Sequence, residues 1–414
     1  MLKAISGTIA ARIITTAMGL LISVIAGHRL GTSGLGSIGL IVLGITLVRL
    51  AMDLVGGSAL VYLVPRVSLG RLLRPCYLWA LMAAGVGYTV VDFFRLVPDG
   101  YSMHVALLAF LQGINAIHLS VLIGQQRIRA NNQIAVMQAV VLVAAFAVLA
   151  RAPDADAQAF VQAAYLSVAT ALVLSFAAMR KRVPVLGKPP ASVLKLLIRQ
   201  STYVQAANGM QLLNYRLAYW LIEKFQGTSL LGIYTVANQL AEGAWLVPKS
   251  LALVLYSKIS NTEGMEGQRL LTLTFLKVSM ACATAVVAVL VLLPSSVFQW
   301  VFGPEVVGIS PLIGLLIPGI LSMAASQAYS HFFSGTARNI HNVIGSGLGL
   351  VVTIAAGLAL IPAIGLAGAA ITATLAYGTS TVYQTIAFMR ITGSRFIDLW
   401  PNAEDGRRLR RMFF

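Results

Sequence analysis

Polar and charged side chains interrupt a long apolar stretch near the middle of the chain. The segment ANQLAEGAWLVPKSLA, residues 237–252, carries Asn238, Glu242 and Lys249 among alanines, leucines and valines. At about 100° per residue, these three side chains share one helix face with Trp245. Glu242 and Lys249 are separated by about 10 Å of helical rise, so an ion pair between them would be stretched. Each is therefore expected to face a cavity, water or another helix.

Other apolar segments carry ionisable or amide side chains as well. Arg12 lies in the first, Arg49 and Asp53 stand four residues apart in the second, and Asn208 shares a face with Arg216 further on. A charge at the centre of a bilayer costs at least about 2.5 kcal/mol, so such residues usually line a bundle interior or an aqueous cavity. Structural explanations remain open in three cases. Arg12 could extend to the interface, Arg49 and Asp53 could form a closed pair, and Arg216 could reach Glu223 or the headgroups.

Cations outnumber carboxylates in this set. Four basic residues stand against two acidic ones, and together they are Arg12, Arg49, Arg216, Lys249, Asp53 and Glu242. A cavity that they line should be cationic, and the membrane-borne anion it would attract is a phosphate or pyrophosphate headgroup, because Arg and Lys donate charge-assisted hydrogen bonds to it. We predict substrate binding by Arg12, Arg49, Arg216, Lys249, Asn208 and Asn238, and ion coupling or gating by Asp53, Glu242 and Lys249.

The composition requires a membrane. Of 414 residues, 58% are hydrophobic and 10% charged, and the mean hydropathy is +0.84, which leaves too little polar surface for a soluble globule. Twelve apolar runs are long enough to cross about 30 Å of hydrocarbon as helices. They lie near 5–27, 35–64, 76–97, 103–124, 133–150, 159–179, 203–222, 230–257, 270–293, 310–335, 342–361 and 366–389. The predicted fold is an all-α integral membrane protein.

The net charge is +17, and the basic residues behind it are distributed unevenly over the loops between these runs. Lys and Arg gather in alternate loops and in the C-terminal tail, while the other loops hold only Arg29, Arg95, Arg151 and Lys224. This asymmetry predicts a multi-pass protein of the plasma membrane with both termini in the cytoplasm, and no nucleic-acid partner. No cleavable signal peptide is expected.

The sequence lacks the motifs of several common kinds of site. Cys76 and Cys282 fall within predicted spans, which argues against a disulfide framework or a zinc site. No phosphate-binding loop of the G-x-x-x-x-G-K-[ST] type occurs. We therefore predict no enzyme activity, no catalytic residue, no metal site and no cofactor, and leave open a coupling ion, H⁺ or Na⁺.

The most basic loop divides the spans into two sets of six. The predicted parts are an N-terminal lobe, a basic cytoplasmic linker, a C-terminal lobe and a basic cytoplasmic tail, over residues 1–182, 183–200, 201–390 and 391–414. HRLGTSGLGSIGL at 28–40 aligns without gaps to KFQGTSLLGIYTV at 224–236, an offset of 196. A weaker G-x-x-R-x-x-x-N match joins 124–131 to 335–342. These matches predict lobes related by a parallel pseudo-twofold repeat. Asp53 is then equivalent to Lys249, and the two would pair across the lobes as a gate.

A longer set of motifs resembles a known family. The stretch LLNYRLAYWLIEKFQGTSLLGIYTVANQLAEGAWLVPKSLALVLYSKIS is similar to the seventh and eighth spans of Wzx-type polysaccharide flippases, which belong to the polysaccharide transporter family. The supporting segments are RLGTSGLGSIGL, IGQQRIRANNQ, LLIPGILS and LALIPAIGLAGAAITATLAYG. This family belongs to the MOP superfamily, together with MATE drug exporters and lipid II flippases.

The resemblance implies a cleft between two six-helix lobes that opens alternately to each side. The implied cargo is an undecaprenyl-pyrophosphate-linked oligosaccharide, moved to the outer leaflet of a bacterial inner membrane for surface polysaccharide biosynthesis. Glycan polymerase and ligase proteins are the implied partners. Arg49 stands where lipid II flippases tend to have Arg, whereas Ala218 replaces an acidic residue that family members often carry. Ion coupling would then fall to Glu242 or Asp53, or be absent.

Two other functions fit parts of this pattern. A MATE-like, cation-coupled exporter of small organic molecules would have an acidic and aromatic cavity, which the excess of basic residues disfavours. A membrane scaffold for a glycan assembly complex would not require the stripe of Asn238, Glu242 and Lys249.

Overall fold

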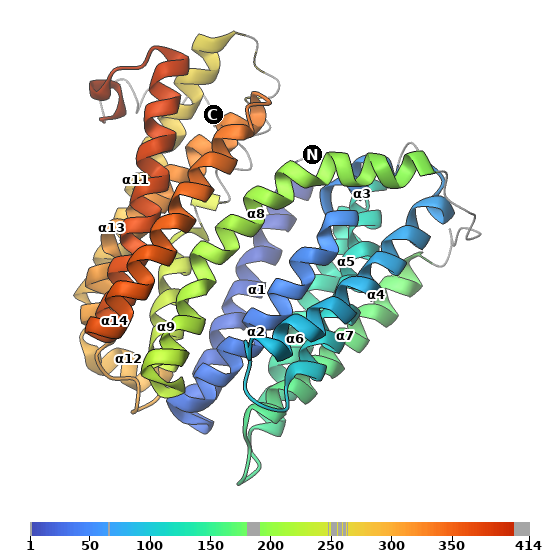
Figure 1. Ribbon diagram of the computed structural model, residues 1–414, viewed down its shortest axis with the longest axis vertical. Coiled ribbons are helices and arrows are strands. Elements are labelled where there is room, and N and C mark those ends of the chain that lie inside the picture. Colours follow the sequence, from blue (N-terminus) through green and yellow to red (C-terminus); the bar gives the residue numbers. More distant parts are fainter. Residues whose placement is uncertain are drawn as a thin grey trace. The chain divides into compact units, whose positions relative to one another are not determined.

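The computed structural model describes residues 2–64, 67–179, 191–246, 248–249, 255, 259, 262 and 264–400. These residues form helices and connecting turns, without a strand among them (Figure 1). Nine of the helices in this described part are long and apolar enough to cross a membrane.

The N-terminal helices follow the first six predicted spans. They are α1 (Leu2–Arg29), α2 (Gly31–Met52), the short 3-10 helix η1 (Asp53–Val55), α3 (Gly57–Leu63), α4 (Leu69–Phe93), α5 (Ser102–Gly124), α6 (Ile128–Leu149) and α7 (Ala157–Met179). The second span is not one continuous helix as predicted. Gly56 and Gly57 break it, with non-helical backbone angles at Gly56 and a φ of +46° at Gly57 that favours glycine.

The C-terminal helices cover the remaining spans. They are α8 (Ala191–Gln226), α9 (Thr228–Ala244), α11 (Met265–Leu292), α12 (Ser295–Phe302), α13 (Ile309–Gly335), α14 (Ile340–Thr392) and the 3-10 helix η3 (Phe396–Leu399). The last two predicted spans both lie in α14. It is interrupted at Ile364 and Gly365, shortly after Pro362, which lacks the backbone N–H that a helix interior needs.

Parts of the predicted polar segments can be followed. The second half of the predicted linker is helical, because α8 already begins at Ala191, while residues 180–190 lie outside the described residues. The basic tail from 401 onward and most of 250–261 also lie outside them.

The chain forms two compact units. Unit 1 comprises residues 1–205 with 228–235 and 299–306, and unit 2 comprises 206–227, 236–298 and 307–414. Within unit 1, α5 packs against α2, α3, α4 and α7, while α6 packs against α1 and α7. Within unit 2, α13 packs against α11 and α14, and their buried core includes Phe275, Tyr329, Phe332 and Phe388.

The repeated G-T-S motif makes a reciprocal contact inside unit 1. A Cβ added to Gly36 would collide with the backbone oxygen of Thr228, and one added to Gly232 would collide with that of Thr32. Thr32 and Thr228, like Gly36 and Gly232, are equivalent at the offset of 196. Each copy of the motif therefore packs its glycine against the threonine carbonyl of the other, a closeness that small residues permit between helices.

A carboxylate anchors one copy of this motif. Glu305, in the loop between α12 and α13, accepts hydrogen bonds from the Thr32 N–H at 2.8 Å and from the Thr32 hydroxyl at 3.1 Å. These donors, the backbone N–H first, hold the pKa of Glu305 below its ordinary value.

The weaker repeat occupies two turns of the same geometry. Gln126 and Ala337, each just before the matched arginine, have φ of +61° and +58°. The N–H of Arg127 donates to Leu122 O at 2.8 Å, and that of Arg338 donates to Phe333 O at 2.7 Å. Both turns close the preceding helix with a bond five residues back, as left-handed helix caps do.

Candidate functional site

A polar cluster joins α8 and α9 within unit 2. The guanidinium of Arg216 pairs with Glu242 at 2.9 Å and donates to the Tyr219 hydroxyl at 2.7 Å. Asn238 donates to Glu242 at 2.8 Å and to the Tyr219 hydroxyl at 3.3 Å. Asn238 and Tyr219 are buried, whereas the Arg216 and Glu242 side chains keep about a quarter of their surface exposed. The cluster therefore couples a charged pair to two neutral polar groups.

The partner of Arg216 differs from the one considered from the sequence. Glu223 is seven residues along the same helix, about 10 Å of rise, which is too far for a short contact. Glu242 comes from α9 and accepts the bond instead. The carboxylate of the polar stripe, Glu242, is therefore paired with a cation from the neighbouring helix.

An aromatic cluster adjoins the ion pair. The rings of Tyr215, Trp245 and Tyr377 lie 5.4–5.8 Å apart, in tilted or edge-on arrangements. Trp245 is buried and donates its indole N–H to Ile320 O at 3.2 Å. The Tyr215 hydroxyl accepts from Gln211 at 2.6 Å. Tyr377 was not predicted, because a single tyrosine in an apolar span carries no pattern that spacing could reveal.

Lys249 lies beside the same tryptophan. Its ammonium nitrogen is 5.6 Å from the centre of the Trp245 ring, a distance at which the cation is attracted to the ring face. The backbone N–H of Lys249 donates to Trp245 O at 2.8 Å. The predicted stripe thus holds two separate contacts, Asn238 with Glu242 and Trp245 with Lys249. Asn208 is exposed on α8, about 12 Å of rise before Arg216.

The basic residues of unit 1 are arranged differently. Arg49 and Asp53 form no ion pair in the part of the chain that the structure describes. The Nε of Arg49 is buried and has no hydrogen-bond partner among the described residues. The closed pair, which the sequence left open as a structural explanation, is therefore not formed among the described residues.

The remaining predicted residues have individual positions. Arg12 is exposed on α1. The backbone oxygen of Asp53 accepts from the Gln205 side chain at 3.3 Å. Asp53 belongs to unit 1 and Lys249 to unit 2, so their pairing stays a prediction.

A buried network in unit 1 was missed by the sequence analysis. His118 is fully buried, and its Nδ1 lies 2.8 Å from the Ser175 hydroxyl, which itself donates to Leu172 O. Its Nε2 lies 2.8 Å from the Tyr77 hydroxyl. Because Ser175 has donated its proton, Nδ1 carries the hydrogen and Nε2 accepts from Tyr77. A neutral histidine is thus fully hydrogen-bonded. In the described part of the chain, no group of three His, Cys, Asp or Glu side chains is placed to hold a metal.

Comparison with known proteins identifies the fold. No protein-family model matches the chain, and no curated protein matches its sequence. An inward-facing multidrug resistance MATE family transporter of the MOP superfamily matches with a TM-score of 0.74 at 14% identity, over 92% of this chain and 95% of that one. The chain has the fold of the MOP superfamily transporters.

Two further solved structures share this fold. The lipid II flippase MurJ, in an inward closed conformation, matches with a TM-score of 0.71 at 13% identity, over 94% of this chain and 88% of that one. A MOP superfamily transporter from Pyrococcus furiosus, whose reversed pocket polarity suggests a different function, matches at 0.63 and 14%, over 95% of both chains. The chain is thus a multi-pass membrane protein whose structural neighbours are transporters and a flippase.

Proposed function

We propose that the chain is a flippase of the Wzx type, which moves undecaprenyl-pyrophosphate-linked oligosaccharides from the cytoplasmic to the outer leaflet of a bacterial inner membrane. The cargo would place its pyrophosphate on basic side chains of the span helices. Its sugars would lie in a hydrated cleft, and its polyprenyl tail would remain in the bilayer.

The observation that carries this proposal is the state of Arg49. It lies on a span helix, makes no ion pair with Asp53, and has a buried Nε without a partner among the described residues. A buried guanidinium nitrogen without an acceptor is costly, and an anionic oxygen would satisfy it. Phosphate oxygens match this donor well.

The polar cluster of unit 2 supports an anionic cargo as well. Glu242, the carboxylate of the predicted stripe, already accepts from Arg216 and Asn238. An organic cation would have to compete with Arg216 for that carboxylate. Lys249 adds a positive charge beside Trp245 of the aromatic cluster.

The proposed cycle needs more than one state. We expect twelve spans in two lobes related by the parallel repeat, with both termini cytoplasmic and a cleft that opens alternately to each side. Asp53 and Lys249 would close its cytoplasmic end in the outward-open state. Glu242 or Asp53 would bind a coupling H⁺ or Na⁺, and polymerase and ligase proteins would receive the product.

A MATE-like exporter of small organic molecules is the second candidate. The shared fold supports it equally, because the solved structures of this fold include multidrug transporters as well as a lipid II flippase. The cluster of Tyr215, Trp245 and Tyr377 is the observation that favours it, since aromatic faces attract organic cations.

Replacement of Arg49 tests the proposal in cells. In a bacterial strain that lacks its own flippase, Arg49→Gln should lower surface polysaccharide about tenfold or more, since a hydrogen bond to a charged group contributes roughly 1.5 kcal/mol or more. Lipid-linked repeat units should accumulate on the inner face. The control is Arg74→Gln on α4, which removes an exposed arginine. Normal polysaccharide output from Arg49→Gln would remove the basis of the proposal.

A further inference from the structure

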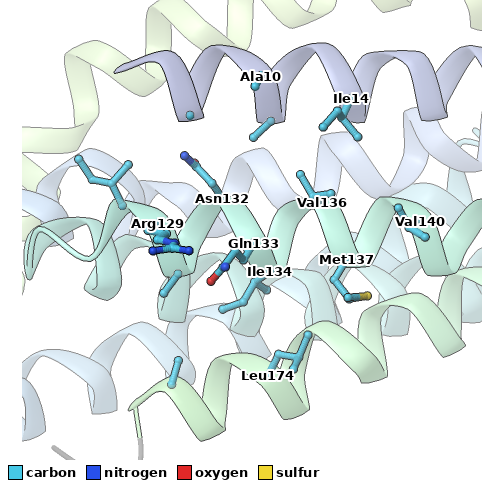
Figure 2. A pocket seen from close by; sticks show the side chains of 15 residues that line it. Ala10, Ile14, Arg129, Asn132, Gln133, Ile134, Val136, Met137, Val140 and Leu174 are labelled. Carbon is cyan, nitrogen blue, oxygen red and sulfur yellow. The ribbon is translucent and has the colours of Figure 1, made fainter. Parts of the chain in front are cut away.

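A groove of about 960 Å³ runs between α1, α6 and α7, entirely within unit 1 (Figure 2). Small side chains keep it open, among them Gly7 and Ala10 of α1, Ala130 of α6 and Ala178 of α7. Of the α6 residues, only Ile134 and Phe146 are buried. Most other α6 residues are partly exposed, and those facing the groove include the exposed Arg129, Gln133, Met137 and Val140.

The groove is polar at one end and apolar at the other. Arg129, Asn132 and Gln133 line its polar end, and Val136, Met137 and Val140 continue along α6 (Figure 2). The Asn132 side chain donates to the Thr8 hydroxyl at 3.1 Å and so ties α6 to α1 at the polar end.

Arg129 is available to a ligand. Its side chain is exposed and makes no hydrogen bond or ion pair with the residues that the structure describes. Arg127, at the same end of α6, is bound to Ala178 O at 2.6 Å. Arg129 therefore offers its whole guanidinium group to an anion.

The length of the groove matches one leaflet. From Arg129 to Val140 the helix rises about 16 Å, and half of a hydrocarbon core of about 30 Å is about 15 Å. A lipid whose headgroup lies at Arg129 would lay its acyl chains along the apolar wall and end near the bilayer centre.

We infer that this groove binds one anionic phospholipid, with the phosphate on Arg129 and the acyl chains between α1, α6 and α7. Basic pockets between transmembrane helices on the cytoplasmic side bind such headgroups, and Arg129 lies at the end of α6 that the charge asymmetry assigns to the cytoplasm. A polyprenyl-pyrophosphate cargo fits less well, because it brings a second phosphate to a groove whose described lining holds one cation, Arg129, and a tail longer than one leaflet. The inference does not depend on the proposed function.

Native mass spectrometry of the purified protein tests the inference. With equal amounts of phosphatidylglycerol and phosphatidylcholine in neutral detergent, the wild-type protein should retain phosphatidylglycerol preferentially. Arg129→Gln should lower the ratio of bound phosphatidylglycerol to phosphatidylcholine about tenfold, through the loss of a charge-assisted hydrogen bond. Arg151→Gln, an exposed arginine beyond the other end of α6, is the matched control and should leave the ratio unchanged.

Steric blocking gives an independent result. Ala10 is exposed and lines the groove, so Ala10→Phe should reduce retention of both lipids, whereas Ala355→Phe, at an exposed position on α14, should not. Equal ratios for Arg129→Gln and the wild type would overturn the inference. So would displacement of phosphatidylglycerol by an equal amount of undecaprenyl phosphate, because the occupant would then be a polyprenyl lipid.

Discussion

The ion pair between Arg216 and Glu242 gives the most quantitative prediction. Arg216→Met removes the guanidinium that lies 2.9 Å from Glu242 and leaves the carboxylate with Asn238 as its hydrogen-bond donor within the polar cluster. Loss of one partner from a fully buried pair costs about 3–5 kcal/mol. Because about a quarter of each side chain is exposed, we expect a smaller loss, about 2–3 kcal/mol in the free energy of unfolding.

The double replacement separates the pair from its surroundings. In Arg216→Met with Glu242→Gln no lone charge remains, so the two losses should not add. We expect the double variant to be more stable than the sum of the singles predicts by about 1–2 kcal/mol. Unfolding of the purified protein by denaturant measures all four members of the cycle.

A matched acidic residue controls for general charge effects. Glu223 lies on the same helix as Arg216 and makes no side-chain hydrogen bond or ion pair among the described residues. Glu223→Gln should therefore show no coupling with Arg216→Met. Additivity within about 0.5 kcal/mol for the Glu242 cycle would refute the pairing.

Three further predictions concern stability. Gly36→Ala or Gly232→Ala should lower the melting temperature, by the equivalent of about 1–3 kcal/mol or more, since the new Cβ meets a backbone oxygen. Gly85→Ala, where a new Cβ has nothing within 4 Å, should not lower it. Equal melting temperatures for all three variants would contradict the close contact. The folded-state pKa of Glu305 is depressed, so its stabilising contribution should be complete above an unfolded pKa of about 4.3 and should be lost as the pH falls through the folded value. Glu305→Gln should therefore flatten this part of a curve of stability against pH. An unchanged curve would count against the Thr32 bonds. Tyr77→Phe should cost about 1–3 kcal/mol in unfolding free energy, because it leaves His118 Nε2 without its donor. The control is Tyr88→Phe, which changes an exposed tyrosine of the same helix. A loss for Tyr77→Phe no larger than that for Tyr88→Phe would exclude the assigned network.

The helices could be predicted because apolar length is read directly from the sequence. Every predicted span of about 20 apolar residues contains a helix. This holds for α8 and α9 too, although Asn208, Arg216 and Glu242 interrupt their apolar runs. The break at Gly56 and Gly57 was missed, because an apolar run remains apolar whether or not two glycines interrupt its helix.

The repeat could be located by identity rather than by hydropathy. The matched G-T-S segments make the same glycine-to-carbonyl contact in both directions, which depends on the absence of a Cβ at Gly36 and Gly232. Because few other residues satisfy this requirement, glycine occurs at both equivalent positions and the repeat can be recognised from residue identity.

The contacts of the candidate site could be predicted only along a single helix. Asn238 and Glu242 are four residues apart, so their proximity follows from helical geometry. The pairing of Arg216 with Glu242, the ring of Tyr377 and the network of His118 join different helices, and no spacing within one segment determines them.

Transport by the purified protein in liposomes tests the central claim most directly. A fluorescent oligosaccharide linked to undecaprenyl pyrophosphate is placed in the membrane, and an impermeant sugar-cleaving enzyme reports how fast it reaches the opposite leaflet. The proposed function predicts flipping that is fast with the wild-type protein and with Arg74→Gln, and strongly slowed by Arg49→Gln. If the lipid-linked sugar stays in its leaflet while the same vesicles move a fluorescent organic cation against a proton or sodium gradient, the protein is an exporter and the claim of an anionic lipid cargo is contradicted.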